Sequence, residues 1–270
     1  MRQEAYFCTI EELNSLGKEN IPQQLISHTH LIYSSPATLA FNSPGAEGFG
    51  VKRAGLAVPG SIMLIVAPGC CGRNTSVLSS MRAYHDRFYY LLMDETDIVT
   101  GRHLKKIPKA VAEICEELEK KPSVVMICIT CVDALLGTDM ERVCRKAEEV
   151  AGLPVKPCYM YALTREGRKP PMVHVRQSIY SLLEPKKKKG NVVNLLGYFS
   201  PLVDDCELYD LLHDAGVKTI HEISRCKDYA EYQTMSEANF NLVLHPEARF
   251  AAEDFHDRLK IPYIELRRLY

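Results

Sequence analysis

The sequence predicts an α/β fold of two Rossmann-like (flavodoxin-like) domains with parallel sheets. Short apolar runs of strand length alternate with longer amphipathic segments over residues 61–270. Strands that alternate with helices in this way form parallel sheets covered by helices on both faces. The alternation is interrupted by four consecutive lysines at residues 186–189 and then resumes. We therefore expect a first domain over residues 1–188, which includes an N-terminal wrap, and a second domain over residues 189–270.

The first domain is predicted to contain four strands. Residues 1–58 show little periodicity, and we interpret them as a wrap over the first sheet. Strands are predicted at residues 62–66, 87–93, 123–130 and 155–161. Helices are predicted at residues 74–84, 104–120, 137–152 and 172–183, mostly from apolar residues that recur every three or four positions. In the third of these helices we expect Val143, Ala147 and Val150 on the inner face and Gly152 at the end.

The second domain repeats the alternation after the lysine run. Strands are predicted at residues 192–196, 218–223, 240–244 and 262–266, and helices at residues 206–213, 232–238 and 249–259. We interpret the lysine run itself as a solvated linker. The alternative interpretation is a docking patch for an acidic partner.

Composition and charge narrow the class of protein. A hydrophobic content of 46% with 25% charged residues is typical of a globular protein with a full core. The formal net charge of −1 gives no reason to expect nucleic acid or an acidic membrane as a partner. No apolar run approaches the roughly 20 residues of a membrane span, and the first residues lack the apolar stretch of a signal peptide. We expect a cytoplasmic protein whose ten cysteines do not form a disulfide framework.

Three of the cysteines lie where predicted strands end. Cys70 and Cys71 are in the turn after the first strand, and Cys131 follows the third. Open parallel sheets bind ligands at the carboxyl edge of their strands, and thiolates are the ligands of iron–sulfur clusters. One chain offers two or three such thiolates, so a site with four requires a second chain. Cysteines within predicted helices, such as Cys115 and Cys144, are expected to be buried packing residues.

The sequence lacks the motifs of several other common enzyme classes. No glycine-rich dinucleotide or Walker A motif is present, and neither is the serine hydrolase elbow nor the zinc-binding His-Glu-x-x-His. Cys128-Ile-Thr-Cys131 has the spacing of a thiol–disulfide motif. However, Cys128 lies inside a predicted strand, whereas a redox dithiol prefers a helix N-terminus.

Several segments together resemble a known family. They are Pro68-Gly-Cys-Cys-Gly72, Asp97-Ile-Val-Thr-Gly-Arg-His-Leu104, Thr130-Cys-Val-Asp-Ala-Leu-Leu-Gly-Thr-Asp139, Asn191-Val-Val-Asn-Leu-Leu-Gly197, Asn241-Leu-Val243 and Ile261-Pro262. In this series the chain resembles the nitrogenase component 1 family, which includes nitrogenase, its cofactor-assembly relatives and the reductases of tetrapyrrole biosynthesis.

The resemblance implies a subunit of a nitrogenase-like oxidoreductase that pairs with an identical or like subunit and holds an iron–sulfur cluster between them. Electrons would come from an ATP-dependent iron–sulfur reductase and reach a substrate bound in the cleft between the domains. Cys131 matches a cluster cysteine of the family. A second cluster cysteine matches Cys71 when the sequences are aligned without a gap, and it matches Cys70 when the alignment is shifted by one residue. The alternatives are a non-catalytic scaffold for cluster or metallocofactor assembly, and a plain binding module.

The chain departs from the family pattern in three places. The family's first cluster cysteine has no counterpart between Ala40 and Gly60, which favours a simple 4Fe-4S cluster over the larger double cluster of nitrogenase. Near the family's cofactor-anchoring cysteine this chain has His245, which could bind metal or be structural. Family members generally carry a further Rossmann-like domain, which residues 1–270 do not contain, and a missing downstream segment is one explanation.

Overall fold

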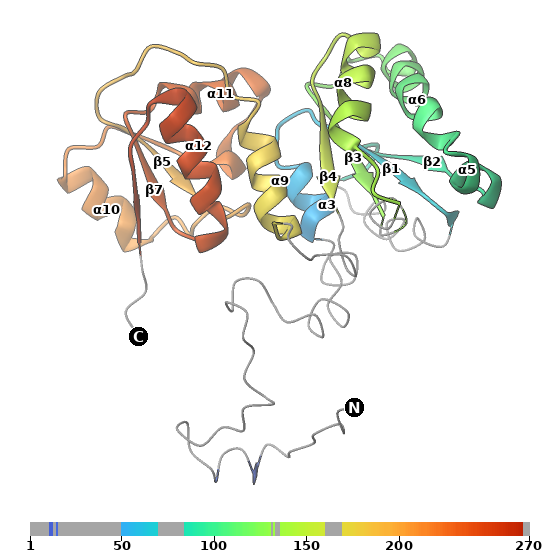
Figure 1. The fold of residues 1–270 in the computed structure, drawn as a ribbon. Helices are drawn as coiled ribbons and strands as arrows, with labels where there is room; N and C mark the ends of the chain where they lie inside the picture. Colours follow the sequence, from blue (N-terminus) through green and yellow to red (C-terminus); the bar gives the residue numbers. More distant parts are fainter. Residues whose placement is uncertain are drawn as a thin grey trace.

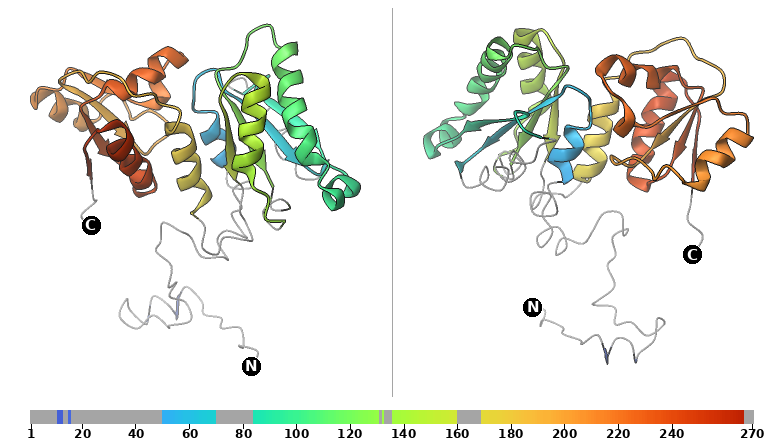
Figure 2. Two further views of the ribbon diagram at one scale, coloured as in Figure 1. Left: turned by 45° about the horizontal axis from the view of Figure 1, so that its top comes forward. Right: turned by 180° about the vertical axis from the view of Figure 1, so that it is seen from behind.

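The computed structural model describes residues 50–69, 84–130, 132, 136–159 and 169–266, together with residues 11, 12 and 15. These residues form two lobes that lie side by side, each built on one parallel sheet (Figure 1), and the two further views agree (Figure 2). The α/β class with two parallel sheets is therefore confirmed. Within the described part of the chain, no helix is both long and apolar enough to cross a bilayer.

The sheet of the first lobe has its switch point between its first and third strands. The strands are β1 (Ile62–Ala67), β2 (Phe88–Leu92), β3 (Val125–Ile129) and β4 (Val155–Tyr159). The order is β2-β1-β3-β4, and all pairs are parallel. The helices among the described residues of this lobe are α3 (Gly50–Gly55), α5 (Glu95–Thr100), α6 (His103–Glu117) and α8 (Met140–Ala151). Because β2 and β3 flank β1 on opposite sides, the connections leave β1 and β3 in opposite directions, the arrangement at which open α/β sheets commonly bind ligands.

The second lobe repeats this topology. Its strands are β5 (Val192–Leu196), β6 (Thr219–His221), β7 (Phe240–Val243) and β8 (Tyr263–Glu265). The order β6-β5-β7-β8 places the switch point between β5 and β7. The helices are α9 (Pro171–Tyr180), which connects the lobes, then α10 (Glu207–Asp214), α11 (Tyr229–Gln233) and α12 (Arg249–Leu259). Residues 169–266 also form three short 3₁₀ helices, η4 (Ile223–Arg225), η5 (Thr234–Glu237) and η6 (Pro246–Ala248).

Helix α8 shows how local sequence sets the boundaries of an element. The Asp139 side chain accepts a hydrogen bond from the backbone N–H of Arg142 and caps the start. Gly152 takes the left-handed conformation at the end, with φ 65°, as predicted. The prediction for Val150 was wrong, because its exposed fraction is 61%. The last turn contacts the core through Ala151, four residues after Ala147, and this turns Val150 toward solvent.

Two helices were not predicted, and a third is divided. Helices α3 and α5 have six residues each, too few to show a 3.6-residue period. Asp94 and Asp97 form a capping box at the start of α5, so the acidic run that follows β2 is a helix cap. The helix predicted at residues 232–238 is instead α11 followed by η5. The predicted helix at residues 74–84 lies largely outside the described residues.

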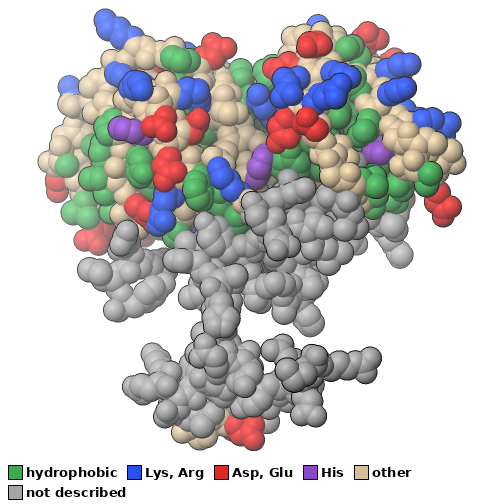
Figure 3. All heavy atoms as spheres, viewed as in Figure 1, with side chains coloured by type: hydrophobic (Ala, Val, Ile, Leu, Met, Phe, Trp, Pro, Cys, Tyr) green, Lys and Arg blue, Asp and Glu red, His purple; other side chains and the backbone are tan. Residues whose placement is uncertain are grey.

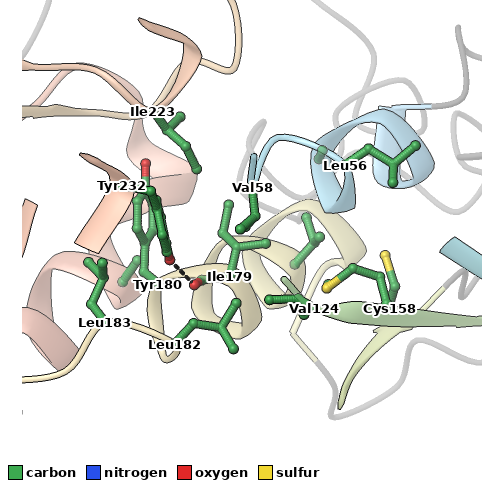
Figure 4. Close-up of a cluster of buried hydrophobic side chains, with 14 of the residues drawn as sticks. Leu56, Val58, Val124, Cys158, Ile179, Tyr180, Leu182, Leu183, Ile223 and Tyr232 are labelled. Atoms are coloured by element: carbon green, nitrogen blue, oxygen red, sulfur yellow. Dashed lines mark hydrogen bonds between the residues drawn. The ribbon is translucent and has the colours of Figure 1, made fainter. Parts of the chain in front are cut away.

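One core extends through both lobes. The two faces of β1 belong to different clusters, because successive side chains alternate across a strand. Met63 and Ile65 face α3 and α9, whereas Leu64 and Val66 face α6 and α8. The cluster on the α9 side continues into the second lobe, where it includes buried residues of η4, α11, η5, β7 and α12. Figure 4 shows part of this cluster, in which the Tyr232 hydroxyl donates to the carbonyl of Ile179 on α9.

The lysine run is fastened to the second lobe at one end. Lys188 Nζ donates to the carbonyl of Ser236 at 2.6 Å, and Lys189 forms an ion pair with Glu237. Lys186 and Lys187 are exposed, as expected for a solvated linker. The division into domains at residue 188 stays a prediction.

Candidate functional site

The predicted cluster cysteines, Cys70, Cys71 and Cys131, lie outside the described residues. The strands that lead to them are described, and these strands are neighbours. β1 pairs with β3 in parallel, with Val66 opposite Ile129 near their carboxyl ends. The two cysteine-bearing segments therefore follow adjacent strands, at the switch point of the first sheet.

A buried hydroxyl marks the end of β3. Thr130 directly precedes Cys131, and its exposed fraction is 5%. Its Oγ1 atom is buried and has no hydrogen-bond partner among the described residues. Such an unpaired donor is costly unless another group accepts from it, and hydrogen bonds to cluster sulfurs are one means by which proteins tune iron–sulfur sites. A buried hydroxyl donor beside Cys131 therefore fits an iron–sulfur cluster at this edge.

Cys128 faces its strand neighbour. It lies opposite Cys158 in the register of β3 and β4, and both side chains are fully buried. The hydrogen bond with Cys158 lowers the pKa of the Cys128 thiol, while burial raises the pKa of Cys158. The Cys158 thiol also approaches the carbonyl of Val51 at 3.4 Å. Cys128 is thus engaged within the sheet, and the expected burial of Cys115 and Cys144 is confirmed.

A cavity of about 730 Å³ lies between the lobes. One wall consists of α3 and the segment that connects it to β1. The opposite wall consists of the loops that follow β5, β6 and β7, at the carboxyl edge of the second sheet. Helix α9 contributes Met172 and Arg176. The cavity thus opens at the switch point of the second sheet, where α/β proteins commonly bind ligands.

The described lining of this cavity is cationic. It includes Arg53, Arg87, Arg176 and Lys227 together with the imidazole of His245, and none of the described lining residues is Asp or Glu. These residues come from five separate segments of the chain, and no motif or period connects them, so sequence reasoning identified only His245.

Arg87 is held by the backbone around the segment before β1. Its guanidinium donates to the carbonyls of Leu56 at 2.8 Å and Ser61 at 3.0 Å, and to Ser61 Oγ at 3.0 Å. Burial lowers the pKa of Arg87. Neutral carbonyls thus orient this arginine, and no carboxylate among the described residues forms an ion pair with it.

Arg176 joins the loops after β5 and β7. It donates to the Gly197 carbonyl at 3.1 and 2.6 Å, forms a 2.8 Å ion pair with Glu247, and lies over the ring of Phe199 at 4.5 Å. Gly197 has φ 139°, and a Cβ there would lie 2.7 Å from the backbone N of His245. Only glycine therefore permits this close approach of the two loops.

His245 is placed at the cavity by these contacts. Its Nδ1 accepts from the backbone N–H of Glu247 at 3.3 Å, so in this tautomer Nε2 carries the ring proton. Burial lowers the pKa of His245, which favours the neutral ring. Within the described residues, no three His, Cys, Asp or Glu side chains gather closely enough to hold a metal ion. A metal-binding role for His245 stays a prediction.

A second cavity, of about 410 Å³, lies against α8, β4 and α9. His174 is central to it, with Nδ1 3.3 Å from Ser178 Oγ and Nε2 3.8 Å from Glu141. The ring packs edge-on against Tyr159 with the centroids 4.3 Å apart. Burial lowers the pKa of His174 to about 4, against a smaller opposing effect of Glu141.

His174 should make the protein sensitive to moderate acid. Since its pKa in the folded state lies below the unfolded value, the unfolded chain binds the extra proton first as the pH falls. Stability should decrease between about pH 6.5 and pH 4, by roughly 3 kcal/mol when complete. Urea unfolding at pH 7.0 and 4.5 should show a smaller pH-dependent loss for His174→Gln than for wild type. His256→Gln, a change of an exposed histidine on α12, is the control, and an unchanged pH dependence in His174→Gln would contradict the assignment.

Comparison with known proteins places the chain among nitrogenase-related sequences. A family model described as nitrogenase component 1 type oxidoreductase matches residues 47–270. The nitrogenase iron-molybdenum cofactor biosynthesis protein NifE of Rhizobium meliloti (strain 1021) is 28% identical over 210 residues, which cover 75% of this chain and 44% of the relative. NifE of Nostoc sp. (strain PCC 7120) is 26% identical and covers 75% and 43%, respectively. The chain thus spans less than half the length of these relatives.

A solved structure, nitrogenase Cp1 at pH 6.5, has a similar fold. The TM-score is 0.61 at 17% sequence identity, and the match covers 94% of this chain and 58% of the other. At this identity the likeness concerns the fold alone.

Proposed function

The chain belongs to the family of nitrogenase component 1 type oxidoreductases, and on that premise we propose that it holds an iron–sulfur cluster where it meets a like subunit. Proteins of this family carry iron–sulfur metalloclusters and work in complexes with other subunits and an ATP-dependent reductase. The finer proposal is a 4Fe-4S cluster that serves electron transfer from such a reductase to a ligand in the cavity between the lobes.

The observation that carries this proposal is the pairing of β1 with β3. Cys70 and Cys71 follow the first of these strands and Cys131 follows the second, and the strands are hydrogen-bonded neighbours at the switch point. Neighbouring strands lie about 4.8 Å apart, so the segments that carry the thiols start close together. Strands on opposite sides of the sheet would have argued against shared ligands.

We assign the cluster ligands to this chain and its partner in equal number. Cys131 and one of Cys70 and Cys71 from each of two chains make the four thiolates of a 4Fe-4S cluster. A cluster bound there supplies one-electron chemistry. The buried hydroxyl of Thr130 would donate a hydrogen bond to a sulfur atom and so favour the reduced, more negative state.

The ligand would bind in the cavity between the lobes. Arg176 and Gly197 hold the loops after β5 and β7 in fixed positions, and His245 presents a ring N–H when its Nδ1 accepts from Glu247. The His245 N–H would bind and orient the ligand as a directed donor, on loops that Arg176 and Gly197 hold in place. The enclosing walls from both lobes exclude part of the solvent, which strengthens each polar contact.

The second candidate is a non-catalytic scaffold for assembly of a metallocofactor. It is favoured by the curated relatives, whose names describe cofactor biosynthesis. In this function the chain would hold a cluster or cofactor precursor and release it to another protein. Both candidates require the same cysteines, and they differ in whether electrons or the cofactor leave the protein.

Anaerobic reconstitution tests the shared part of the proposal. The purified chain should take up about two irons per chain, or four per dimer, after incubation with ferrous iron and sulfide. Iron and sulfide analysis, electron paramagnetic resonance and the oligomer mass are the measurements. ATP-dependent reduction of the bound cluster by a partner reductase would support the relay, and transfer of iron to an acceptor protein would support the scaffold. Failure to take up iron without oxygen would refute both.

A further inference from the structure

We propose that the cavity between the lobes recognises a ligand with two or more anionic groups, through Arg53 on one wall and Lys227 on the other. The inference rests on the proposed function, in which this cavity is the ligand site, and adds the chemical class of the ligand. Neither residue belongs to the segments that carry the family resemblance.

The charge of the cavity is unbalanced. The whole chain has 33 basic and 34 acidic side chains, and on the face shown in Figure 3 the two kinds are interspersed. By contrast, the described lining contains four Arg and Lys side chains and no Asp or Glu. Glu247 balances Arg176 from behind the lining, whereas Arg53, Arg87 and Lys227 form no ion pair with a described residue. Like charges that share one cavity repel one another, and an anionic ligand relieves that repulsion.

Arg53 is fixed on the wall of the cavity by the burial of its own helix. Val51, Lys52 and Ala54 are buried in the core on one side of α3. Gly50, Arg53 and Ala57 recur at spacings of three and four and line the cavity. The exposed guanidinium of Arg53 keeps its hydrogen-bond donors available because no described residue is bonded to it. It presents a planar fork that suits a carboxylate or phosphate.

Lys227 stands on the opposite wall, directly after η4. Its backbone N–H donates to Glu231 at 2.7 Å, which anchors the main chain and leaves the ammonium to solvent. Ser224 lines the same wall, and its Oγ is buried without a hydrogen-bond partner among the described residues. An unsatisfied hydroxyl beside a free ammonium is suited to an anionic oxygen atom, which would accept from both.

The other two cations of the described lining, Arg87 and Arg176, are engaged in contacts within the protein, and they add positive potential to the cavity. Arg87 is committed to backbone carbonyls and Arg176 to Glu247 and Gly197. Cations on two facing walls match a ligand with anionic groups at both ends better than a single small anion.

Isothermal titration calorimetry with defined probes tests the proposal. Pyrophosphate and malonate are the probes with two anionic groups, inorganic phosphate is the compact anion, and glycerol is the neutral control. Pyrophosphate or malonate should bind the full chain more tightly than phosphate, and added salt should weaken the binding. Arg53→Gln and Lys227→Gln should each weaken it about tenfold or more, the loss of one charge-assisted hydrogen bond. Lys109→Gln, which removes an exposed cation of α6, should change it less than about twofold.

The outcomes separate this inference from the proposed function. Whether pyrophosphate or malonate binds better assigns the anionic groups to phosphates or carboxylates. Absence of salt-sensitive binding in wild type, or equal binding in Arg53→Gln and Lys227→Gln, overturns the proposal. Iron content, measured in the same preparations, should not change in either variant. Iron uptake without anion binding would refute only the anionic-ligand proposal. Anion binding without iron uptake would refute only the proposed iron–sulfur function.

Discussion

Replacement of Cys131 by serine is expected to abolish iron uptake during anaerobic reconstitution. A serine hydroxyl is a poor ligand for iron–sulfur clusters, which are held by thiolates. The loss should also weaken the association of the two chains, because a cluster shared between them links them through metal–sulfur bonds. Iron analysis and analytical ultracentrifugation of reconstituted wild type and Cys131→Ser are the measurements.

The matched variants make this result specific. Of Cys70→Ser and Cys71→Ser, one should behave like Cys131→Ser and the other like wild type, which identifies the second ligand. Cys206→Ser is the control, since Cys206 is a partly buried residue at the N-cap position before α10 in the other lobe. Full iron content in Cys131→Ser would show that the proposed ligand set is wrong.

Arg176→Gln should destabilise the fold by about 3 to 5 kcal/mol, the usual cost of breaking a buried ion pair from one side. Arg176 is 4% exposed, and the mostly buried side chain of its partner Glu247 would remain without a counter-charge. The Gly197 carbonyl would lose two hydrogen bonds in the same change. The melting temperature should fall by roughly 10 °C for a chain of this size.

A double-mutant cycle separates the ion pair from the packing of the arginine. Arg176→Gln with Glu247→Gln should be less destabilising than the sum of the single changes, because the pair couples the two sites. Arg142→Gln, at an exposed position of α8, should change stability by less than about 0.5 kcal/mol. Urea unfolding provides the comparison, and a loss below 1 kcal/mol for Arg176→Gln would contradict the structural role.

The sheets were more predictable from sequence than the cavity. The runs at β1 and β3 are continuously apolar because both faces of a parallel strand are buried, and this signal is local. The switch points depend on the order of the strands in each sheet. That order is set by which strands pair, and the sequence alone does not indicate it. Short elements such as α5 depend on a capping box and left no periodic signal.

The cavity residues were missed for a different reason. Arg53, Arg87 and Lys227 line one cavity only through tertiary packing, and nothing in the sequence around each of them marks it as a site residue. The exposure of Val150 was missed for a related reason, since the contact at the end of α8 depends on the sheet beneath it. Composition indicates the overall charge of the chain, and the fold decides where charges of one sign meet.

Helix α9 belongs both to the core that runs through the two lobes and, through Arg176, to the cavity. A hinge between the lobes would have to break that core, so we expect the cavity to keep its shape whether or not a ligand is bound. Ligand binding then requires little ordering of the protein, and more of the contact energy appears as affinity. The same rigidity limits adaptation, because a ligand that does not fit cannot induce a better arrangement. Substitutions deep in the core, far from any ligand, should therefore alter selectivity as well as stability.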